Sequence, residues 1–336
     1  MKKVRKSVLL RFIVTAALFG LILSKLGGFG EIARVLKGIS PAFIVLTIAA
    51  ITVDRALMTF KWGRLLAAQG SNLGLLPGMK IYCASMVSGI VLPMSVGADA
   101  VRTYMASRIG LNAGRVVASI VVERAIGFLA SLVVGLAGFV VLSKSGVLHE
   151  QFGWIWWTGG GVLVLGLLVL SLSFNKKVYI WLDRGLLSRI GDSKPARVLR
   201  EFQANYRAYG NQKRLLASFF GLSVLEQLTT LLYMWLVAIG LGVEVGLLYF
   251  AGALPLALLI SRLPITFHGL GLFDGVFALL LSYSGVPMAQ SVAITLGVRI
   301  LELAAWFPWW LAYLVERSTL NPAASTPGCP ELPERP

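Results

Sequence analysis

The sequence is poor in cysteine, histidine and acidic residues, and each shortage excludes a class of protein. Only two of its 336 residues are cysteines, Cys83 and Cys329, which excludes a disulfide framework. Because His149 and His268 are the only histidines and no CxxC motif is present, we expect no metal site. GxSxG, HExxH, P-loop and strand-linked GxGxxG motifs are also missing, so we expect no catalytic residues, no enzymatic activity and no cofactor.

Charged side chains of both signs are scarce, and apolar ones are abundant. Charged residues make up 14% of the chain, against about 25% in soluble domains, and apolar residues make up 57%, against about 45–50%. Mean hydropathy is +0.79. The apolar residues lie in blocks of about 18 or more, which is the length of a membrane-spanning helix. These features exclude a soluble fold and predict an all-α protein that crosses a membrane several times.

Six segments are long enough to cross a bilayer, and two further apolar stretches are broken. The long segments are Val8–Leu26, Ala42–Phe60, Val116–Ser143, Trp154–Phe174, Leu215–Gly240 and Ala289–Leu314. The broken stretches are Ile81–Val96, interrupted by Gly89 and Pro93, and Leu247–Tyr283, interrupted by Pro255, Pro264 and the glycine-rich Gly269–Gly275. We predict about six full spans and two broken or re-entrant helical hairpins. Whether the second stretch is re-entrant or forms two short spans is open at this point.

The basic residues determine the expected orientation. The formal net charge is +16, and ten Lys or Arg residues lie in the linker Asn175–Arg214 alone. Three basic segments are expected on the cytoplasmic side: this linker, the N-terminal leader and Gly97–Arg115. They can all lie on that side only if Ile81–Val96 enters the bilayer and returns to the side from which it came. Non-helical backbone at membrane depth must be buried in protein or line a wet cavity, so this hairpin also predicts a cavity. We expect a multi-pass protein of the bacterial inner (plasma) membrane with both termini cytoplasmic.

The same distribution of charge limits the partners. No basic stretch is interleaved with stacking aromatic residues, so we expect no nucleic-acid partner. Basic loops that flank apolar spans instead meet anionic lipid headgroups. Membrane lipids are therefore the expected partners, and a lipid- or glycan-modifying enzyme is a further candidate.

Two parts of the chain share a spacing pattern. Asp54, Pro93 and Arg124 lie 39 and 31 residues apart, and Glu226, Pro264 and Arg299 lie 38 and 35 residues apart. A glycine and an aspartate follow each proline, Gly97 and Asp99 in one case and Gly271 and Asp274 in the other. In the expected topology the first hairpin enters from the cytoplasmic side and the second broken stretch starts from the outside, which predicts an inverted repeat with its site at the interface of the halves. The expected divisions are a first membrane repeat (1–174), a cytoplasmic linker (175–214), a second membrane repeat (215–316) and a disordered tail (317–336).

Three passages carry a family resemblance. The stretch from Pro93 to Arg102 resembles the P-x3-G-x-[DE]-x2-R signature of the lysylphosphatidylglycerol synthase transmembrane-region family, also called flippase-like (UPF0104-type). Glu123-Arg124 resembles the Glu-Arg of that family's next span, and Pro264–Asp274 resembles its P-x-S-x-G-G-x-G-x-x-E element, with Asp274 in place of Glu. The similarity extends from about Val8 to Leu314. It implies a protein that moves a lipid or lipid-linked precursor between leaflets. Only about 22 residues follow Leu314, so we expect no added aminoacyl-transferase domain.

Ionisable residues at membrane depth are functional candidates, because each costs at least about 2.5–3.5 kcal/mol to insert. The buried charges that we expect are Asp54, Arg55, Glu123, Arg124, Glu226, Arg262, Arg299 and Glu302. Arg299 and Glu302 are spaced to pair along one helix face, and so are Asp99 and Arg102. Glu123 or Glu226 is expected to meet an arginine of the opposite repeat, and Arg55 to reach towards Lys61 at the cytoplasmic face.

These candidates have different expected roles. For binding a substrate headgroup we select Arg124, Arg299, Arg102, Asp99, Ser95 and Thr266. For proton coupling or buried charge we select Glu123, Glu226, Asp54 and Glu302, of which Glu123 and Glu226 are the preferred proton carriers. The residues expected to break the hairpins are Pro93, Gly97, Pro264, Gly269 and Gly271.

Three functions fit these features. The first is a transporter that moves a phospholipid or a polyprenyl-phosphate-linked precursor between leaflets. The second is a membrane scaffold for a lipid- or glycan-modifying enzyme, acting through its basic linker. The third is an intramembrane enzyme that acts on lipid headgroups. We prefer the transporter, because an inverted repeat with broken helices and buried charges is typical of secondary transporters.

Overall fold

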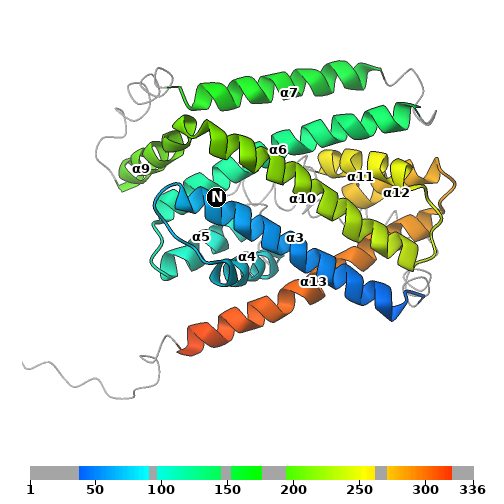
Figure 1. Ribbon diagram of the computed structural model, residues 1–336, viewed down its shortest axis with the longest axis horizontal. Helices are drawn as coiled ribbons and strands as arrows, with labels where there is room; N and C mark the ends of the chain where they lie inside the picture. The colour runs from blue at the N-terminus through cyan, green and yellow to red at the C-terminus, as the bar shows by residue number, and fades with distance from the viewer. Residues whose placement is uncertain (1–37, 91–96, 145–152, 176–193, 262–270, 320–336) are drawn as a thin grey trace, which may run out of the picture.

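The computed structural model describes residues 38–90, 97–144, 153–175, 194–261 and 271–319, and these residues form an all-helical bundle (Figure 1). The α-helices are α3 (Pro41–Ala67), α4 (Leu75–Ile90), α5 (Gly97–Arg108), α6 (Ala113–Lys144), α7 (Trp154–Ser173), α9 (Lys194–Ala208), α10 (Lys213–Gly240), α11 (Leu247–Ser261), α12 (Leu272–Ser282) and α13 (Met288–Thr319). A short 3₁₀ helix, η3 (Tyr209–Asn211), joins α9 to α10.

Four of the described helices are long and apolar enough to cross a membrane: α3, α6, α10 and α13. They match four of the six predicted spans. Helix α7 matches a fifth, and its apolar stretch Trp157–Ser173 is shorter. The predicted span Val8–Leu26 lies outside the described residues. The protein is therefore a polytopic membrane protein, as its hydropathy predicts.

The second broken stretch contains a pair of short helices, α11 and α12, whereas the first, Ile81–Val96, contains only part of α4, and the other arm of its pair is α5, which lies beyond Val96. Helices α4 and α5 pack against each other, and so do α11 and α12. They contain 16, 12, 15 and 11 residues. At about 1.5 Å per residue, each is shorter than the hydrocarbon core of about 30 Å. These lengths fit two helical hairpins that enter the membrane and return.

Two of the predicted helix breakers do not break a helix. Gly89 lies inside α4, where an added Cβ would come 2.6 Å from the Cβ of Ala98 on α5. Gly89 therefore lets the two arms of the hairpin approach closely. Pro255 lies inside α11, and its carbonyl group faces Gly135 of α6. Helices inside a membrane tolerate such a proline where neighbouring helices pack around it.

The helices form two halves with the same internal contacts. Helices α3, α4, α5 and α6 of the first half correspond in order to α10, α11, α12 and α13 of the second. In the first half, α3 packs on α4, α4 on α5 and α5 on α6. In the second half, α10 packs on α11, α11 on α12 and α12 on α13. The contacts between halves obey the same correspondence, since α6–α11 becomes α13–α4 and α3 packs against α10.

The two halves have opposite directions in the bundle. Figure 1 shows α3 antiparallel to α10 and α6 antiparallel to α13, with the α4–α5 hairpin at one end of the molecule and the α11–α12 hairpin at the other. Each hairpin thus enters from its own end. This is the arrangement of an inverted repeat.

The helices of both halves also end in the same way. Gly70 after α3, Gly242 after α10, Gly110 after α5 and Gly285 after α12 all have positive φ angles, between 71° and 89°. In each case the amide of the next residue donates to the carbonyl group five positions earlier, as in a Schellman C-cap. Glycine adopts this left-handed conformation without steric cost.

The basic linker helix α9 lies against the membrane bundle. Tyr206 stacks on Phe174 at the end of α7 and on Phe202 of its own helix, and it hydrogen-bonds with Ser173 at 2.8 Å. Next to them, Tyr209 of η3 donates to the Leu65 carbonyl group of α3 at 2.9 Å. Burial raises the pKa of the Tyr209 phenol, which keeps it a neutral donor.

Candidate functional site

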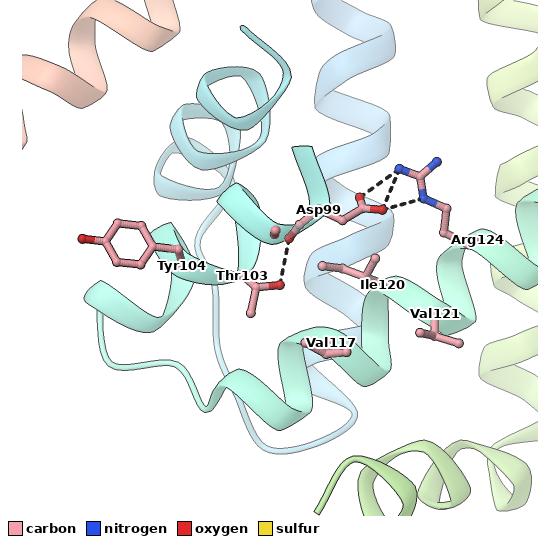
Figure 2. A pocket seen from close by; sticks show the side chains of 8 residues that line it. Asp99, Thr103, Tyr104, Val117, Ile120, Val121 and Arg124 are labelled. Atoms are coloured by element: carbon pink, nitrogen blue, oxygen red, sulfur yellow. Dashed lines mark hydrogen bonds and ion pairs between the residues drawn. The ribbon is translucent and has the colours of Figure 1, made fainter. Parts of the chain in front are cut away.

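A pocket of about 720 Å³ opens between α5 and α6, with an ion pair at one end (Figure 2). Its lining is mainly apolar and consists of Asp99, Ala100, Thr103, Tyr104, Val117, Ile120, Val121 and Arg124. Arg124 donates to both carboxylate oxygens of Asp99, at 2.9 Å and 3.0 Å. The Arg124 side chain is still 54% exposed and Asp99 is 14% exposed. A guanidinium that is held in this two-point geometry and remains accessible can bind a second oxyanion.

The second half contains an equivalent ion pair in a different environment. Arg299 of α13 lies 3.4 Å from Asp274 of α12, and these residues are 25 positions apart, as are Arg124 and Asp99. Asp274 is fully buried, and it also accepts a hydrogen bond from the Gly271 amide at 2.9 Å. Arg299 is 29% exposed. This pair is therefore more enclosed than the pair in the first half.

Arg102 and Glu123 form a buried cluster behind the pocket. The Arg102 guanidinium lies 3.0 Å from Glu123 and 3.6 Å from Asp99, and its planar face covers Trp62 and Tyr82 with centroid distances of 4.9 Å and 4.7 Å. The Tyr82 hydroxyl donates to Glu123 at 3.0 Å. The expected Asp99–Arg102 pair is present. Glu123 meets an arginine of its own half instead of the opposite half. Arg102 is 1% exposed, so it holds α5 and α6 together from inside the protein.

A third group of charges lies between the halves, near the middle of α3, α10 and α13. Asp54 is fully buried, contacts Arg55 at 2.5 Å and accepts a hydrogen bond from Thr229 of α10. The Arg55 guanidinium covers the Trp306 ring at 5.4 Å. Arg55 is therefore a central residue, and the prediction that it extends to the cytoplasmic face is wrong.

Glu302 belongs to the same central group. It accepts a hydrogen bond from the Tyr233 hydroxyl of α10 at 3.2 Å. The expected pairing of Arg299 with Glu302 is not the one found, because Arg299 pairs with Asp274. Asp274 of the hairpin helix α12 pairs with Arg299 in place of Glu302, which lies on the same helix as Arg299.

Glu226 pairs with Lys61 across the interface of the halves. The Lys61 ammonium also donates to Ser223 at 3.1 Å and lies 5.0 Å from the centre of the Phe219 ring. Lys61 is 2% exposed. The sequence correctly predicts that Glu226 meets a basic residue of the opposite half, but this residue is a lysine of α3 and not an arginine.

Gly97 and Gly271 lie where the second arm of each hairpin begins. Helix α5 starts at Gly97, and Gly271 caps the start of α12 with a φ of 78°. Six of the predicted residues lie outside the described part of the chain: Ser95, Thr266, Pro93, Pro264, Gly269 and Arg262. Among the described residues, no group of three His, Cys, Asp or Glu side chains lies close enough together to hold a metal ion.

Comparison with known proteins identifies the family. A sequence model described as the lysylphosphatidylglycerol synthase TM region matches residues 8–309. The chain belongs to this family. Two proteins of Methanothermobacter thermautotrophicus, both named UPF0104 membrane protein, are 24% and 23% identical to it. The first alignment covers 88% of this chain and 91% of the relative, and the second covers 90% of each.

Some residues that contact the buried charges were not predicted from the sequence. Lys61 lies seven positions after Asp54 and so occupies the same face of α3, which was a usable signal. Tyr82, Tyr233 and Thr229 carried no such signal. A hydroxyl group in an apolar helix has a low insertion cost, and only the packing of α4 and α10 shows which carboxylate it meets.

Proposed function

We propose that this protein moves a phosphate-bearing lipid between the two leaflets of the membrane. The observation that carries the proposal is the pocket between α5 and α6, with its apolar walls and its accessible Arg124. An acyl chain fits against the apolar wall that Val117, Ile120 and Val121 form. The lipid phosphate would exchange places with Asp99 on the Arg124 guanidinium, which can hold two oxygens at once.

The position of Arg124 along its helix supports this function. Arg124 lies 11 residues after the start of α6, which is about 17 Å along the helix axis. An arginine this deep in an apolar span carries a large insertion cost, and such residues mark substrate pathways. The pocket therefore offers a lipid headgroup a polar contact well below the membrane surface.

The equivalent pair gives the pathway a second station, by which we mean an Asp–Arg pair whose arginine can bind the headgroup. Arg299 lies 11 residues after the start of α13, which runs in the opposite direction to α6. A headgroup that leaves Arg124 would therefore find the same chemistry at a similar depth from the other face. Transporters with inverted repeats expose such sites to the two faces in turn.

Charge at the ends of the bundle supports an orientation. Helix α9 lies at the same end of the molecule as the C-terminus of α3 and the N-termini of α6 and α10 (Figure 1). Arg64, Arg115, Arg207 and Lys213 belong to this end. By the positive-inside rule we assign this end to the cytoplasm of an inner (plasma) membrane. Membrane lipids are then the partners, and the protein acts as a transporter and not as an enzyme.

A liposome assay tests the transport of lipid. Purified protein is placed in vesicles that contain a phosphatidylglycerol with a fluorescent headgroup, and external dithionite is added. Transport predicts that the protected inner-leaflet fluorescence is lost rapidly, and that Arg124→Ala slows this loss at least about tenfold. Arg108→Ala is the matched control, because Arg108 is an exposed arginine of α5 outside the pocket lining, and it should leave the rate unchanged.

Two results would contradict the proposal. No acceleration over empty vesicles, with a panel of anionic and zwitterionic lipids, would favour a scaffold over a transporter. A change in the mass of the lipid after incubation would favour an enzyme that modifies headgroups. Equal rates for Arg124→Ala and Arg108→Ala would separate the pocket from any transport observed.

A further inference from the structure

Among the described residues, the ionisable groups inside the bundle form three clusters, and two of them are balanced in charge. Arg102 and Arg124 balance Asp99 and Glu123 in the first half. Lys61 balances Glu226 between α3 and α10. In both clusters every carboxylate contacts a cation directly. Glu123 and Glu226, the proton carriers that the sequence favours, thus each contact a cation directly, Arg102 and Lys61 respectively.

The third cluster has one negative charge too many among the described residues. It contains the carboxylates Asp54, Asp274 and Glu302, but only the two cations Arg55 and Arg299. Arg55 pairs with Asp54 and Arg299 pairs with Asp274. Glu302 is left with the Tyr233 hydroxyl as its hydrogen-bond donor. An unbalanced carboxylate inside a membrane is costly, and binding a proton removes that cost.

Glu302 also has the right position for coupling. It lies 14 residues from the start of α13 and 17 from its end, and α13 packs against α3, α4, α10 and α12. A change in its charge is therefore felt by both halves and by an arm of each hairpin. The charged or titratable groups nearest to it are Arg55 and Asp54 from α3, Tyr233 from α10, Arg299 on its own helix, Tyr82 of α4 beyond Arg55, and Asp274 of α12 beyond Arg299.

The surroundings of Glu302 contain buried polar atoms that lack partners. The Nε atoms of Arg55 and Arg299 and the Nε1 atom of Trp306 are buried and have no hydrogen-bond acceptor. Arg55 is 9% exposed and contacts Trp306 directly. Buried donors normally have partners, and water is the usual one where protein groups are missing. A water molecule beside Glu302 would satisfy these donors and would give a proton a path to the carboxylate.

We infer that Glu302 binds and releases a proton during each transport cycle, so that lipid movement is coupled to a proton gradient. The inference rests on the proposed transport function. The proton comes from water on one side of the membrane, binds the Glu302 carboxylate, and returns to water on the other side after the halves have moved. While Glu302 is charged it attracts Arg55 and Arg299 and restrains α13 against α3. Once neutral, it releases this restraint.

The test combines lipid movement with a direct measurement of the proton. Dithionite-monitored movement of headgroup-labelled phosphatidylglycerol is measured in vesicles between pH 5.5 and pH 8.5, with and without a pH gradient. We expect faster movement as the pH falls, because protonation removes the restraint, and a further effect of the gradient. Glu302→Gln should abolish both dependences. Glu316→Gln is the matched control, since Glu316 is a partly exposed carboxylate near the end of the same helix.

Infrared difference spectroscopy of the reconstituted protein between the two pH values provides a second readout. A carbonyl band of a protonated carboxylic acid should be present in the wild type and in Glu316→Gln, and absent in Glu302→Gln. Tyr233→Phe removes the hydrogen bond that favours the charged carboxylate, so this band should persist to a higher pH than in the wild type. This variant keeps the test decisive if Glu302→Gln does not fold.

The outcomes distinguish failure of this inference from failure of the transport proposal. Lipid movement that is independent of pH in the wild type overturns the inference and leaves transport standing. Movement that depends on sodium ions and not on pH also overturns it. An infrared band that is unchanged in Glu302→Gln assigns the proton to another carboxyl group and overturns it as well. Absence of any lipid movement contradicts the transport proposal, whereas the infrared band still reports on Glu302.

Discussion

The two Asp–Arg pairs of the molecule have the same place in the repeat but different environments. Both arginines lie 11 residues into a long span, and both pair with an aspartate 25 positions earlier. The arginines Arg124 and Arg299 are 54% and 29% exposed. The aspartates Asp99 and Asp274 are 14% and 0% exposed. The sequence repeat is thus symmetric while the conformation is not. In a transporter with an inverted repeat, this difference corresponds to one open and one closed station.

The interfaces between the halves also differ. Helices α6 and α11 pack so closely at Gly138 and Gly252 that an added Cβ on Gly138 would lie 2.7 Å from the Gly252 carbonyl oxygen. The equivalent pair, α4 and α13, includes an exposed ion pair between Lys80 and Glu316. Backbone contact is expected to hold one end of the bundle shut, while the other end is linked by side chains that separate easily.

The largest expected effect comes from breaking the enclosed pair. Asp274→Asn leaves Arg299 without its carboxylate and should cost about 3 kcal/mol of stability, the low end for a broken buried pair. Asp99→Asn should cost less, because solvent screens Arg124 and the buried Arg102 keeps its closer partner Glu123. Unfolding of both variants in the same detergent measures the difference. Equal losses would show that the two pairs are enclosed to the same degree.

Thiol accessibility tests the open and closed stations directly. Thr103 lines the pocket in the first half, and Ala278, the position 175 residues later, is fully buried. In a background without Cys83 and Cys329, Thr103→Cys should react at least about thirtyfold faster than Ala278→Cys, since exposing a buried site costs about 2 kcal/mol or more. A titration with a membrane-permeant maleimide gives both rates. Comparable rates would mean that the stations open together.

The long helices were largely predictable, because hydropathy reports depth in the membrane. Helix α5, the second arm of the first hairpin, was not, because its charged residues give it no apolar run. The predicted spans 116–143, 215–240 and 289–314 lie close to α6, α10 and α13. Helix α3 instead continues seven residues beyond the predicted end at Phe60. It does so because Trp62, Leu65 and Leu66 still face the protein core. Hydropathy gives no warning of this, since Lys61 and Arg64 make the segment appear to end.

The ion-pair partners were the least predictable feature. Spacing along one helix favoured Arg299 with Glu302 and gave Lys61 no partner. The actual partners are Asp274 and Glu226, which lie on other helices. Their choice depends on how the halves are rotated against each other, and a single sequence contains no direct record of this rotation. The correspondence of Asp99 with Asp274 and of Arg124 with Arg299 was visible, because it follows from the repeat itself.

The contact between α6 and α11 should be sensitive to a single methyl group. Gly138→Ala places a Cβ against the Gly252 backbone, which cannot move aside, and should cost about 1–2 kcal/mol through overpacking. Gly127→Ala on the same helix is the control, because no atom lies within 4 Å of its added Cβ. Thermal unfolding in detergent compares the two variants. If both are equally stable, close backbone contact does not hold this interface.

The smallest effect is expected at the interface between α4 and α13. Lys80→Met removes the ion pair with Glu316. The Lys80 side chain is 28% exposed and the Glu316 side chain is 51% exposed. Exposed pairs contribute less than about 1 kcal/mol, and salt weakens them further, so the melting temperature should change little and the change should vanish at high salt. A loss as large as that of Gly138→Ala would show that the two interfaces resist separation equally. The asymmetry between the ends would then be confined to the Asp–Arg stations.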